Sequence, residues 1–274
     1  MMPEESKREN KKELKDFKNH IVMFSGGVAS WASALKLSRM LPGQKVWLLF
    51  ADTLIEDEDL YRFLEDGAKV IPNSQLVRIS EGRTPWDVFE DERYINHRVA
   101  KCSMRLKQEP CRKWVEDSFD PSDTAVHVGI DWGEYERLEG IQRGWAPYTV
   151  FAPLCEDDWW DAARCLEALA EFAIARPRLY DLGFIHNNCG GFCCRAGKKQ
   201  FSQLLQHFPK RYAEHAKREQ QFRDKIGNQQ VGILRETRGG KRRIVSLAEF
   251  QARGRQLQLV EEVSSCGCFF SPDE

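Results

Sequence analysis

Short apolar segments alternate with helix-like segments through the first half of this 274-residue chain. Residues 45–51 and 125–130 are mostly apolar, as is typical of strands buried on both faces of a parallel sheet. Between such runs, apolar residues recur with the period of a helix. The expected strands are residues 20–24, 45–51, 75–79 and 125–130, and the expected helices are 31–41, 57–70 and 105–118. This alternation predicts βαβ units and an α/β fold around a parallel sheet.

The pattern changes after Pro153. The later expected elements are helices at 159–175, 200–223 and 248–253 and a short strand at 242–247. We therefore divide the chain into a charged tail (1–18), a sheet domain (19–180) and a Cys-rich, mostly helical C-terminal module (181–274).

The charged residues are nearly balanced, with 41 Lys and Arg against 42 Asp and Glu and a formal net charge of −1. This balance argues against a generally basic nucleic-acid-binding protein. Basic residues nevertheless recur in the C-terminal third, at 198–199, 210–211, 217–218 and 241–243. This basic strip is either a solvated helix face or a path for a polyanionic substrate such as tRNA or DNA.

No apolar run is long enough to span a membrane, and the charged N-terminal segment lacks the apolar core of a signal peptide. The sequence therefore predicts a soluble, cytoplasmic protein that has no membrane partner.

A glycine-containing loop follows the first expected strand. Ser25, Gly26 and Gly27 lie between that strand and the helix that begins near Ser30. The glycines allow close approach of the backbone, while the helix N-terminus and the serine hydroxyls supply hydrogen-bond donors to an anion. No Gly-Lys-Ser/Thr follows, so the loop is not a Walker A loop. The segment predicts a phosphate-binding site.

The pattern Ser-Gly-Gly-x-x-Ser at this position resembles the PP-loop family of ATP pyrophosphatases and adenine-nucleotide α-hydrolases. Downstream segments resemble the phosphoadenylyl-sulfate (PAPS) reductase branch of that family. The matching segments are 50–53, Cys102-Ser103 with Lys107, and 129–131 with Glu134 and Arg137. The resemblance covers roughly residues 20–215 and implies a PP-loop nucleotide-binding domain.

The resemblance implies which residues bind an adenine nucleotide of the ATP or PAPS type. These binding residues are Ser25, Gly26, Gly27, Ser30, Asp52, Gly129 and Glu134. The residues implied in catalysis are Cys102, Asp52, Lys107 and Arg137. Ala29 replaces an acid that many PP-loop enzymes carry, so Asp52 either positions a Mg²⁺ ion in its place or serves as the N-cap of the following helix.

Nine cysteines are many for a cytoplasmic chain, and their clustering favours metal ligation or redox chemistry. The proposed ligands are Cys189, Cys193, Cys266 and Cys268, with Cys194 as a substitute. Four thiolates suit either tetrahedral Zn²⁺ or a [4Fe–4S] cluster. The resemblance to sulfur-handling PP-loop proteins favours the cluster. Cys102 is a sulfur carrier or catalytic thiol, a cluster ligand or a packing residue.

Three functions remain open. The leading one is PAPS reductase-like sulfur chemistry, in which a thiol attacks sulfur and a thiol reductant regenerates the enzyme. The second is an ATP pyrophosphatase that adenylates a nucleic-acid or small-molecule group and then accepts sulfur from a donor. The third is a non-catalytic nucleotide-sensing subunit of an oligomer or multi-protein assembly. Ser103 replaces a second cysteine of the iron–sulfur reductases, and the Glu-Cys-Gly-Ile-His segment of PAPS reductases is absent.

Overall fold

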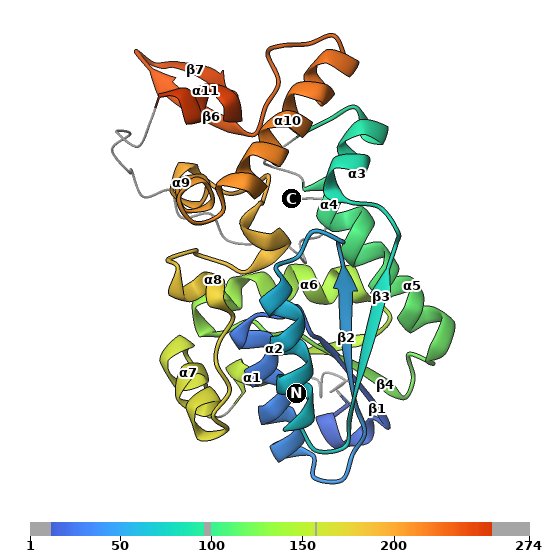
Figure 1. The fold of residues 1–274 in the computed structure, drawn as a ribbon. Helices are drawn as coiled ribbons and strands as arrows, with labels where there is room; N and C mark the ends of the chain where they lie inside the picture. The colour runs from blue at the N-terminus through green and yellow to red at the C-terminus, as the bar shows by residue number, and fades with distance from the viewer. Residues whose placement is uncertain (1–11, 96–99, 157, 254–274) are drawn as a thin grey trace, which may run out of the picture.

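The computed structural model describes residues 12–95, 100–156 and 158–253. Its centre is a five-stranded sheet in the order β3-β2-β1-β4-β5, in which every pairing is parallel (Figure 1). The strands are β1 (Asn19–Met23), β2 (Val46–Asp52), β3 (Ser74–Ser80), β4 (Thr124–His127) and β5 (Thr149–Phe151). This sheet confirms the predicted α/β class.

The strand order reverses direction between β1 and β4. From β1 the chain moves outward through β2 and β3, and then returns to the other side of β1 as β4 and β5. Such a reversal opens a crevice at the carboxyl ends of the two central strands, where ligands bind in open α/β sheets. The loop after β1 and the loop after β4 therefore face a common space.

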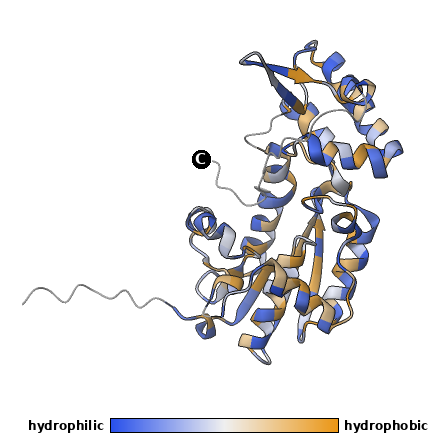
Figure 2. Cartoon of the chain, turned by 90° about the vertical axis from the view of Figure 1, so that its left-hand side faces the viewer, coloured by the Kyte–Doolittle hydropathy of each residue, from blue (hydrophilic) through white to orange (hydrophobic). Residues whose placement is uncertain are grey.

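Alternate residues of each strand point to opposite faces, and each face has its own helices. Val22 and Leu48 pack with α1 (Val28–Met40), α2 (Glu58–Lys69) and α7 (Ala162–Glu171). Ile21 and Leu49 pack with α5 (Glu109–Ser118) and α6 (Leu138–Trp145) on the other face. Figure 2 shows the strands of the central sheet mostly hydrophobic, with hydrophilic residues on the outer sides of the helices. The result is a helix–sheet–helix arrangement with the sheet buried.

The C-terminal part forms a second apolar core. Its elements are α9 (Lys198–His207), α10 (Pro209–Lys225), the hairpin of β6 (Leu234–Arg238) and β7 (Lys241–Val245), and α11 (Leu247–Ala252). Phe201, Tyr212 and Phe222 pack with Trp86 and Phe89 of α3 (Pro85–Glu92), so an early segment of the chain contributes to this core (Figure 1).

A buried carboxylate fastens the hairpin and α11 to α10. Glu219 accepts hydrogen bonds from the backbone N–H groups of Ile233 (2.9 Å) and Leu247 (2.6 Å). These bonds satisfy donors that would otherwise be buried without partners.

Several element boundaries differ from the sequence-based expectation. The helix expected at 159–175 begins only at Ala162, because Asp161 caps it by accepting a hydrogen bond from the N–H of Arg164 (2.9 Å). The helix expected at 105–118 begins as the short α4 (Lys101–Ser103) and a π-helical turn, η2 (Met104–Gln108). The strand β5 and the helix α3 were not expected. No helix in the described ranges is long and apolar enough to cross a membrane.

Candidate functional site

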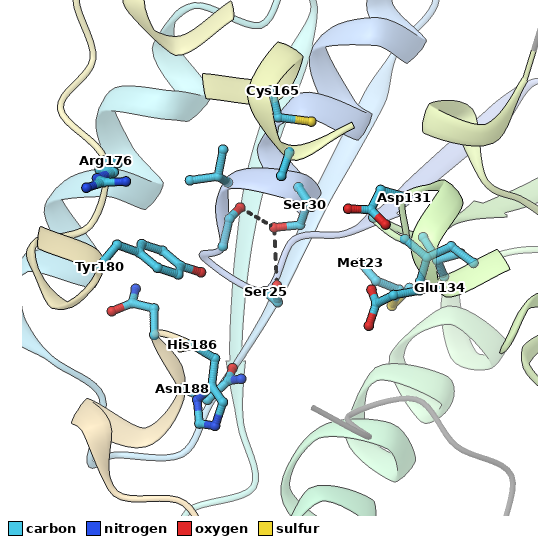
Figure 3. A pocket seen from close by; sticks show the side chains of 18 of the residues that line it. Met23, Ser25, Ser30, Asp131, Glu134, Cys165, Arg176, Tyr180, His186 and Asn188 are labelled. Atoms are coloured by element: carbon cyan, nitrogen blue, oxygen red, sulfur yellow. Dashed lines mark hydrogen bonds between the residues drawn. The ribbon is translucent and has the colours of Figure 1, made fainter. Parts of the chain in front are cut away.

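A pocket of about 390 Å³ opens at the carboxyl ends of β1 and β4 (Figure 3). Three segments form most of its walls: the loop of residues 25–30, the segment 128–137 after β4, and residues 176–188. Ala162, Cys165 and Leu166 of α7 complete the lining. In Figure 3, Ser25 and Ser30 lie between Tyr180 and His186 on one side and Asp131 and Glu134 on the other. The pocket therefore occupies the crevice that the strand order creates.

The glycine loop is shaped for an anion. Gly26 has φ +80°, and a Cβ there would lie 2.8 Å from Cγ of Leu60, so a side chain is excluded on both counts. The Ser30 hydroxyl donates to the carbonyl of Gly27 (2.8 Å), and the Ser25 hydroxyl donates to the hydroxyl oxygen of Ser30 (3.2 Å). Among the described residues, no side chain caps the N-terminus of α1 at Gly27. The helix thus directs its positive end into the pocket.

Gly129 permits the close contact between the two central loops. A Cβ at this position would lie 2.5 Å from the Cα and 2.7 Å from the N of Ser30. Because both atoms belong to the backbone, a side chain at Gly129 would displace the loop. Gly129 therefore sets the distance between the phosphate-binding turn and the segment after β4.

The pocket wall after β4 carries charges of both signs. Glu134 and Arg137 line the pocket and form an ion pair, and Asp131 lines it as the N-cap of η3 (Trp132–Arg137). Asp131 accepts from the N–H of Gly133 (2.9 Å). Of the predicted nucleotide-binding or catalytic residues, the lining includes Ser25, Gly27, Ser30, Gly129, Glu134 and Arg137. The structure thus brings these six together.

The third wall contains polar groups that sequence reasoning did not assign to the nucleotide site. Burial, reinforced by the charge of Lys107, lowers the pKa of His186 to about 4, so its imidazole is neutral at pH 7. Asn187 donates from Nδ2 to the carbonyl of Gly26 (3.4 Å). Its Oδ1 is buried and has no hydrogen-bond partner among the described residues. This oxygen is available to accept a hydrogen bond from a ligand.

Asp52 lies outside the pocket lining and is held by other groups. It accepts hydrogen bonds from the Leu54 N–H (2.8 Å), the Tyr61 hydroxyl (2.9 Å) and Nε of Arg78 (2.9 Å). The N-cap of α2 is Asp57, which accepts from the N–H of Asp59 (3.1 Å). Asp52 is therefore not that N-cap, and its proposed role beside the nucleotide stays a prediction.

Lys107 also lies outside the pocket lining, in a buried ionic group beneath the cysteine loop. Its Nζ is 3.3 Å from Oε1 of Glu56, and the Lys107 and Glu56 side chains are 9% and 0% exposed. Glu56 accepts hydrogen bonds from the Thr53 hydroxyl (2.9 Å) and from the backbone N–H of Cys189. Lys107 is thus linked through Glu56 to the cysteine loop, and its catalytic role stays a prediction.

The cysteine loop, residues 189–194, continues directly from the pocket wall. Cys189 has φ +52° and is followed by two glycines with positive φ. Burial raises the pKa of the Cys189 thiol, and the charges of Glu56, Cys193 and Cys102 raise it further. The Sγ atoms of Cys102 and Cys194 are 3.7 Å apart. The structure therefore gathers Cys102 with the thiols of the cysteine loop.

The predicted metal ligands are only partly within the structure. Cys266 and Cys268 lie outside the described residues, whereas Cys189 and Cys193 belong to the cysteine loop. Within the described ranges, no group of three or more His, Cys, Asp or Glu side chains is arranged to hold a metal ion. These residues by themselves do not fit a Zn²⁺ ion or an iron–sulfur cluster, and we derive no chemical step through either.

Comparisons with known proteins give distant likenesses. No family model and no curated protein matches the chain. A phosphoadenylyl-sulfate reductase from Candida auris, in a phosphate complex, is 17% identical over 61% of this chain and 80% of its own, with a TM-score of 0.44. An NMN synthetase from Francisella tularensis is 10% identical over 73% of this chain and 87% of its own, with a TM-score of 0.40. The sequence motifs resemble the PAPS reductase branch, and we base the proposed function on the residues of the pocket.

Proposed function

We propose that the chain is an adenine-nucleotide-dependent enzyme of sulfur chemistry, similar to a PAPS reductase. The observation that carries the proposal is the continuity of one segment. Asn187 and Asn188 line the pocket beside the glycine loop, and Cys189 follows them directly in the chain. An anion held by the glycine loop would therefore bind beside a segment that leads directly into a cluster of thiols.

In this proposal the phosphate or sulfate group lies against the N-terminus of α1. The hydroxyls of Ser25 and Ser30 become donors to the anion when they rotate away from their present acceptors, Ser30 Oγ and the Gly27 carbonyl. The first-turn N–H groups supply donors, and Arg137 supplies a positive charge. Fixed donors of this kind stabilise the negative charge that develops as a bond to phosphorus or sulfur breaks. A thiolate then attacks the sulfur of PAPS, the S–O bond to the phosphate breaks, and the nucleotide leaves through that phosphate oxygen. One thiolate of an external dithiol attacks the protein sulfur of the resulting S-sulfonate and displaces sulfite. The second thiolate then displaces the protein thiol, so the reductant leaves as a disulfide.

ATP pyrophosphatase chemistry is the second candidate, and the acidic side of the pocket favours it. Asp131 and Glu134 both line the pocket. Mg²⁺ is bound in proteins by one or two carboxylates together with nucleotide phosphates, so these residues fit a magnesium ion. The ion would neutralise phosphate charge while an acceptor is adenylated. A nucleic-acid acceptor along the basic strip would compete with acidic side chains for its cations, because Lys198 pairs with Glu236 and Arg211 with Asp57.

The subcellular location and the partners of the protein follow from the same proposal. The seven cysteines within the described ranges form no disulfide with one another. The proposed reaction uses cysteine thiols and an external thiol, which fits a reducing compartment, so we place it in the cytoplasm, with a thiol reductant or a sulfur donor as partner.

Two activity measurements test the proposal. The leading function predicts release of sulfite from PAPS in the presence of a dithiol reductant. The second predicts release of pyrophosphate from Mg²⁺-ATP in the presence of a nucleic-acid or small-molecule acceptor. Nucleotide binding without either product would favour a nucleotide-sensing subunit and would contradict both enzymatic functions.

A binding experiment tests the glycine loop itself. The double substitution Ser25→Ala/Ser30→Ala should weaken nucleotide binding at least tenfold in calorimetry, because it removes two donors to the anion. Ser38→Ala is the matched control, since Ser38 lies in α1 and its hydroxyl donates to the carbonyl of Leu35 (2.8 Å). Equal affinities of the double variant and the control would contradict the loop assignment.

A further inference from the structure

Two thiols from distant parts of the chain meet beside the cysteine loop. Cys102 comes from α4 and Cys194 from the end of the loop, and their Sγ atoms are 3.7 Å apart. A disulfide has an S–S length of about 2 Å, so the two sulfurs must approach each other by less than about 2 Å to form the bond. Side-chain rotation covers distances of this order without displacing the backbone.

The two thiols differ in their access to solvent. Cys194 is 2% exposed, whereas Cys102 is partly exposed. An external reagent therefore reaches Cys102 first, and Cys194 meets only what is already attached to Cys102. This is the arrangement of an attacking thiol and a resolving thiol.

The surroundings hold both thiols in place. Phe192 packs in the C-terminal core, with its ring stacked 4.0 Å from that of His215, and so fixes the loop just before Cys194. On the other side, Lys101 and Arg105 both form ion pairs with Glu92, which anchors α4. The short sulfur–sulfur distance is thus set by packing on both sides.

We propose that Cys102 and Cys194 form a reversible dithiol–disulfide centre beside the nucleotide pocket. With a low-molecular-weight disulfide R–S–S–R as oxidant, the Cys102 thiolate attacks one sulfur, forms a mixed disulfide and releases R–SH after protonation. The Cys194 thiolate then attacks Sγ of Cys102 and displaces the second R–SH. Two protein thiols and R–S–S–R become one protein disulfide and two R–SH, so two electrons pass to the oxidant.

The proposal is independent of nucleotide binding, so it is tested on the full-length chain without nucleotide. The protein is reduced under anaerobic conditions, desalted, exposed to oxidised glutathione and then alkylated before non-reducing peptide mapping. We expect one main product, a peptide pair joined through Cys102 and Cys194, which dithiothreitol returns to free thiols.

Variants separate the roles of the two thiols. Cys194→Ser should accumulate glutathione on Cys102, because the resolving thiol is missing, and the yield of internal disulfide should fall at least tenfold. Cys102→Ser should lose both products at this site. Cys111→Ser is the matched control, since Cys111 is buried in the core on the other side of the sheet, and it should behave as the parent protein.

Three results would overturn the proposal. One is the absence of any internal disulfide at oxidant concentrations that modify Cys102. Another is a disulfide that joins other cysteines, such as Cys189 and Cys193. The third is protein purified with stoichiometric zinc or iron in which Cys102 and Cys194 resist alkylation until the metal is removed, because the thiols would then be metal ligands. None of these results bears on nucleotide affinity, which is measured separately.

Discussion

The glycine loop lines the pocket and the cysteine loop continues from the pocket wall, and the two loops are held in different ways. The glycine loop is fixed by close packing, with Gly26 against the side chain of Leu60 and Gly129 against the backbone of Ser30. The cysteine loop is fixed by buried charges: Glu56 accepts from the N–H of Cys189, and Arg211 donates to the carbonyl of Gly190 (2.7 Å). Both loops need glycine, since a Cβ at Gly190 would lie 2.6 Å from the carbonyl oxygen of Ile55. The cysteine loop depends in addition on particular charged side chains. The loss of a buried charge should therefore disturb the cysteine loop, whereas it should leave the glycine loop in place.

The largest effect is expected at Asp57, which holds the cysteine loop through Arg211. Asp57 is fully buried and accepts hydrogen bonds from Nε of Arg178 (2.7 Å) and from Arg211 (2.9 Å). Asp57→Ala leaves both cations without this partner, so we expect a loss of about 3 kcal/mol in the free energy of unfolding, measured with urea. The arginines are partly exposed, which keeps the loss below that of a fully buried pair.

The same variant should loosen the cysteine loop. Alkylation of Cys194 in the folded protein should be faster in Asp57→Ala than in the parent protein. Asp66→Ala is the control, because Asp66 lies on the same helix but pairs with Arg62 and Lys69 at the surface, and its effect should stay below about 1 kcal/mol. Equal losses of unfolding free energy in the two variants would show that the ion pairs of Asp57 with Arg178 and Arg211 contribute no more to stability than a surface pair.

The next effect is expected in the glycine loop. Gly129→Ala places a Cβ against the backbone of Ser30, so the loop must shift. We expect a loss of about 2 kcal/mol in stability and nucleotide binding that is at least tenfold weaker by calorimetry. Gly140→Ala is the control, since a Cβ there meets nothing within 4 Å and Gly140 lies in α6. The control should be neutral or slightly stabilising, and weakened binding in it would contradict the assignment.

The sequence predicted where the glycine loop lies in the fold, whereas it predicted the surroundings of the cysteine loop only in part. The glycine loop is a local pattern, because the strand, the two glycines and the helix are consecutive, and five of its six residues line the pocket. The contact between Cys102 and Cys194 joins residues 92 positions apart, and no local pattern encodes it. The wall made by Arg176, Tyr180 and Asn187 likewise depends on how the chain returns to the sheet. The roles of single carboxylates were also ambiguous in the sequence. Asp52 was one of the candidates for the N-cap of the helix after β2, yet Asp57 is the N-cap of that helix, α2.

The pH dependence of stability should report on the C-terminal core. Burial, with the charges of Arg211 and Arg218, lowers the pKa of His215 to about 3. The unfolded chain binds a proton near pH 6.5 while the folded chain does not, so stability is highest above pH 6.5 and falls as the pH decreases toward the folded pKa. Each such histidine contributes a slope of about 1.4 kcal/mol per pH unit in that window. His186 adds a second contribution, since its pKa is lowered to about 4.

A substitution separates the two histidines. His215→Phe keeps an aromatic ring against Phe192 and removes one titrating group, but it leaves Nε1–H of Trp86 without its acceptor (3.0 Å in the parent). We expect lower stability at pH 7 by about 1–2 kcal/mol and a shallower loss between pH 6 and 4 than in the parent protein, measured by urea unfolding. An unchanged slope would mean that His215 does not stay neutral in the folded protein.

The smallest effect is expected at Asn187, where the two loops come together. Its Nδ2 donates to the carbonyl of Gly26 in the glycine loop, and its own backbone leads into the cysteine loop. Asn187 lines the pocket, and its buried Oδ1 has no partner among the described residues. An adenine nucleotide offers two kinds of donor to this oxygen, the N6 amino group and the ribose hydroxyls. Asn187→Ala should therefore weaken ATP binding about fivefold, which corresponds to about 1 kcal/mol.

Comparison of ATP with ITP identifies the donor, because ITP carries a carbonyl where ATP carries the amino group. If the amino group is the donor, the parent protein prefers ATP and Asn187→Ala loses that preference. If a ribose hydroxyl is the donor, the substitution weakens both nucleotides equally. Asn228→Ala, at an exposed turn where Oδ1 accepts from the N–H of Gln230 (2.8 Å), is the control and should bind both as the parent does. Unchanged affinity for both nucleotides in Asn187→Ala would mean that Oδ1 of Asn187 accepts no hydrogen bond from the ligand. The nucleotide would then not extend as far as Asn187.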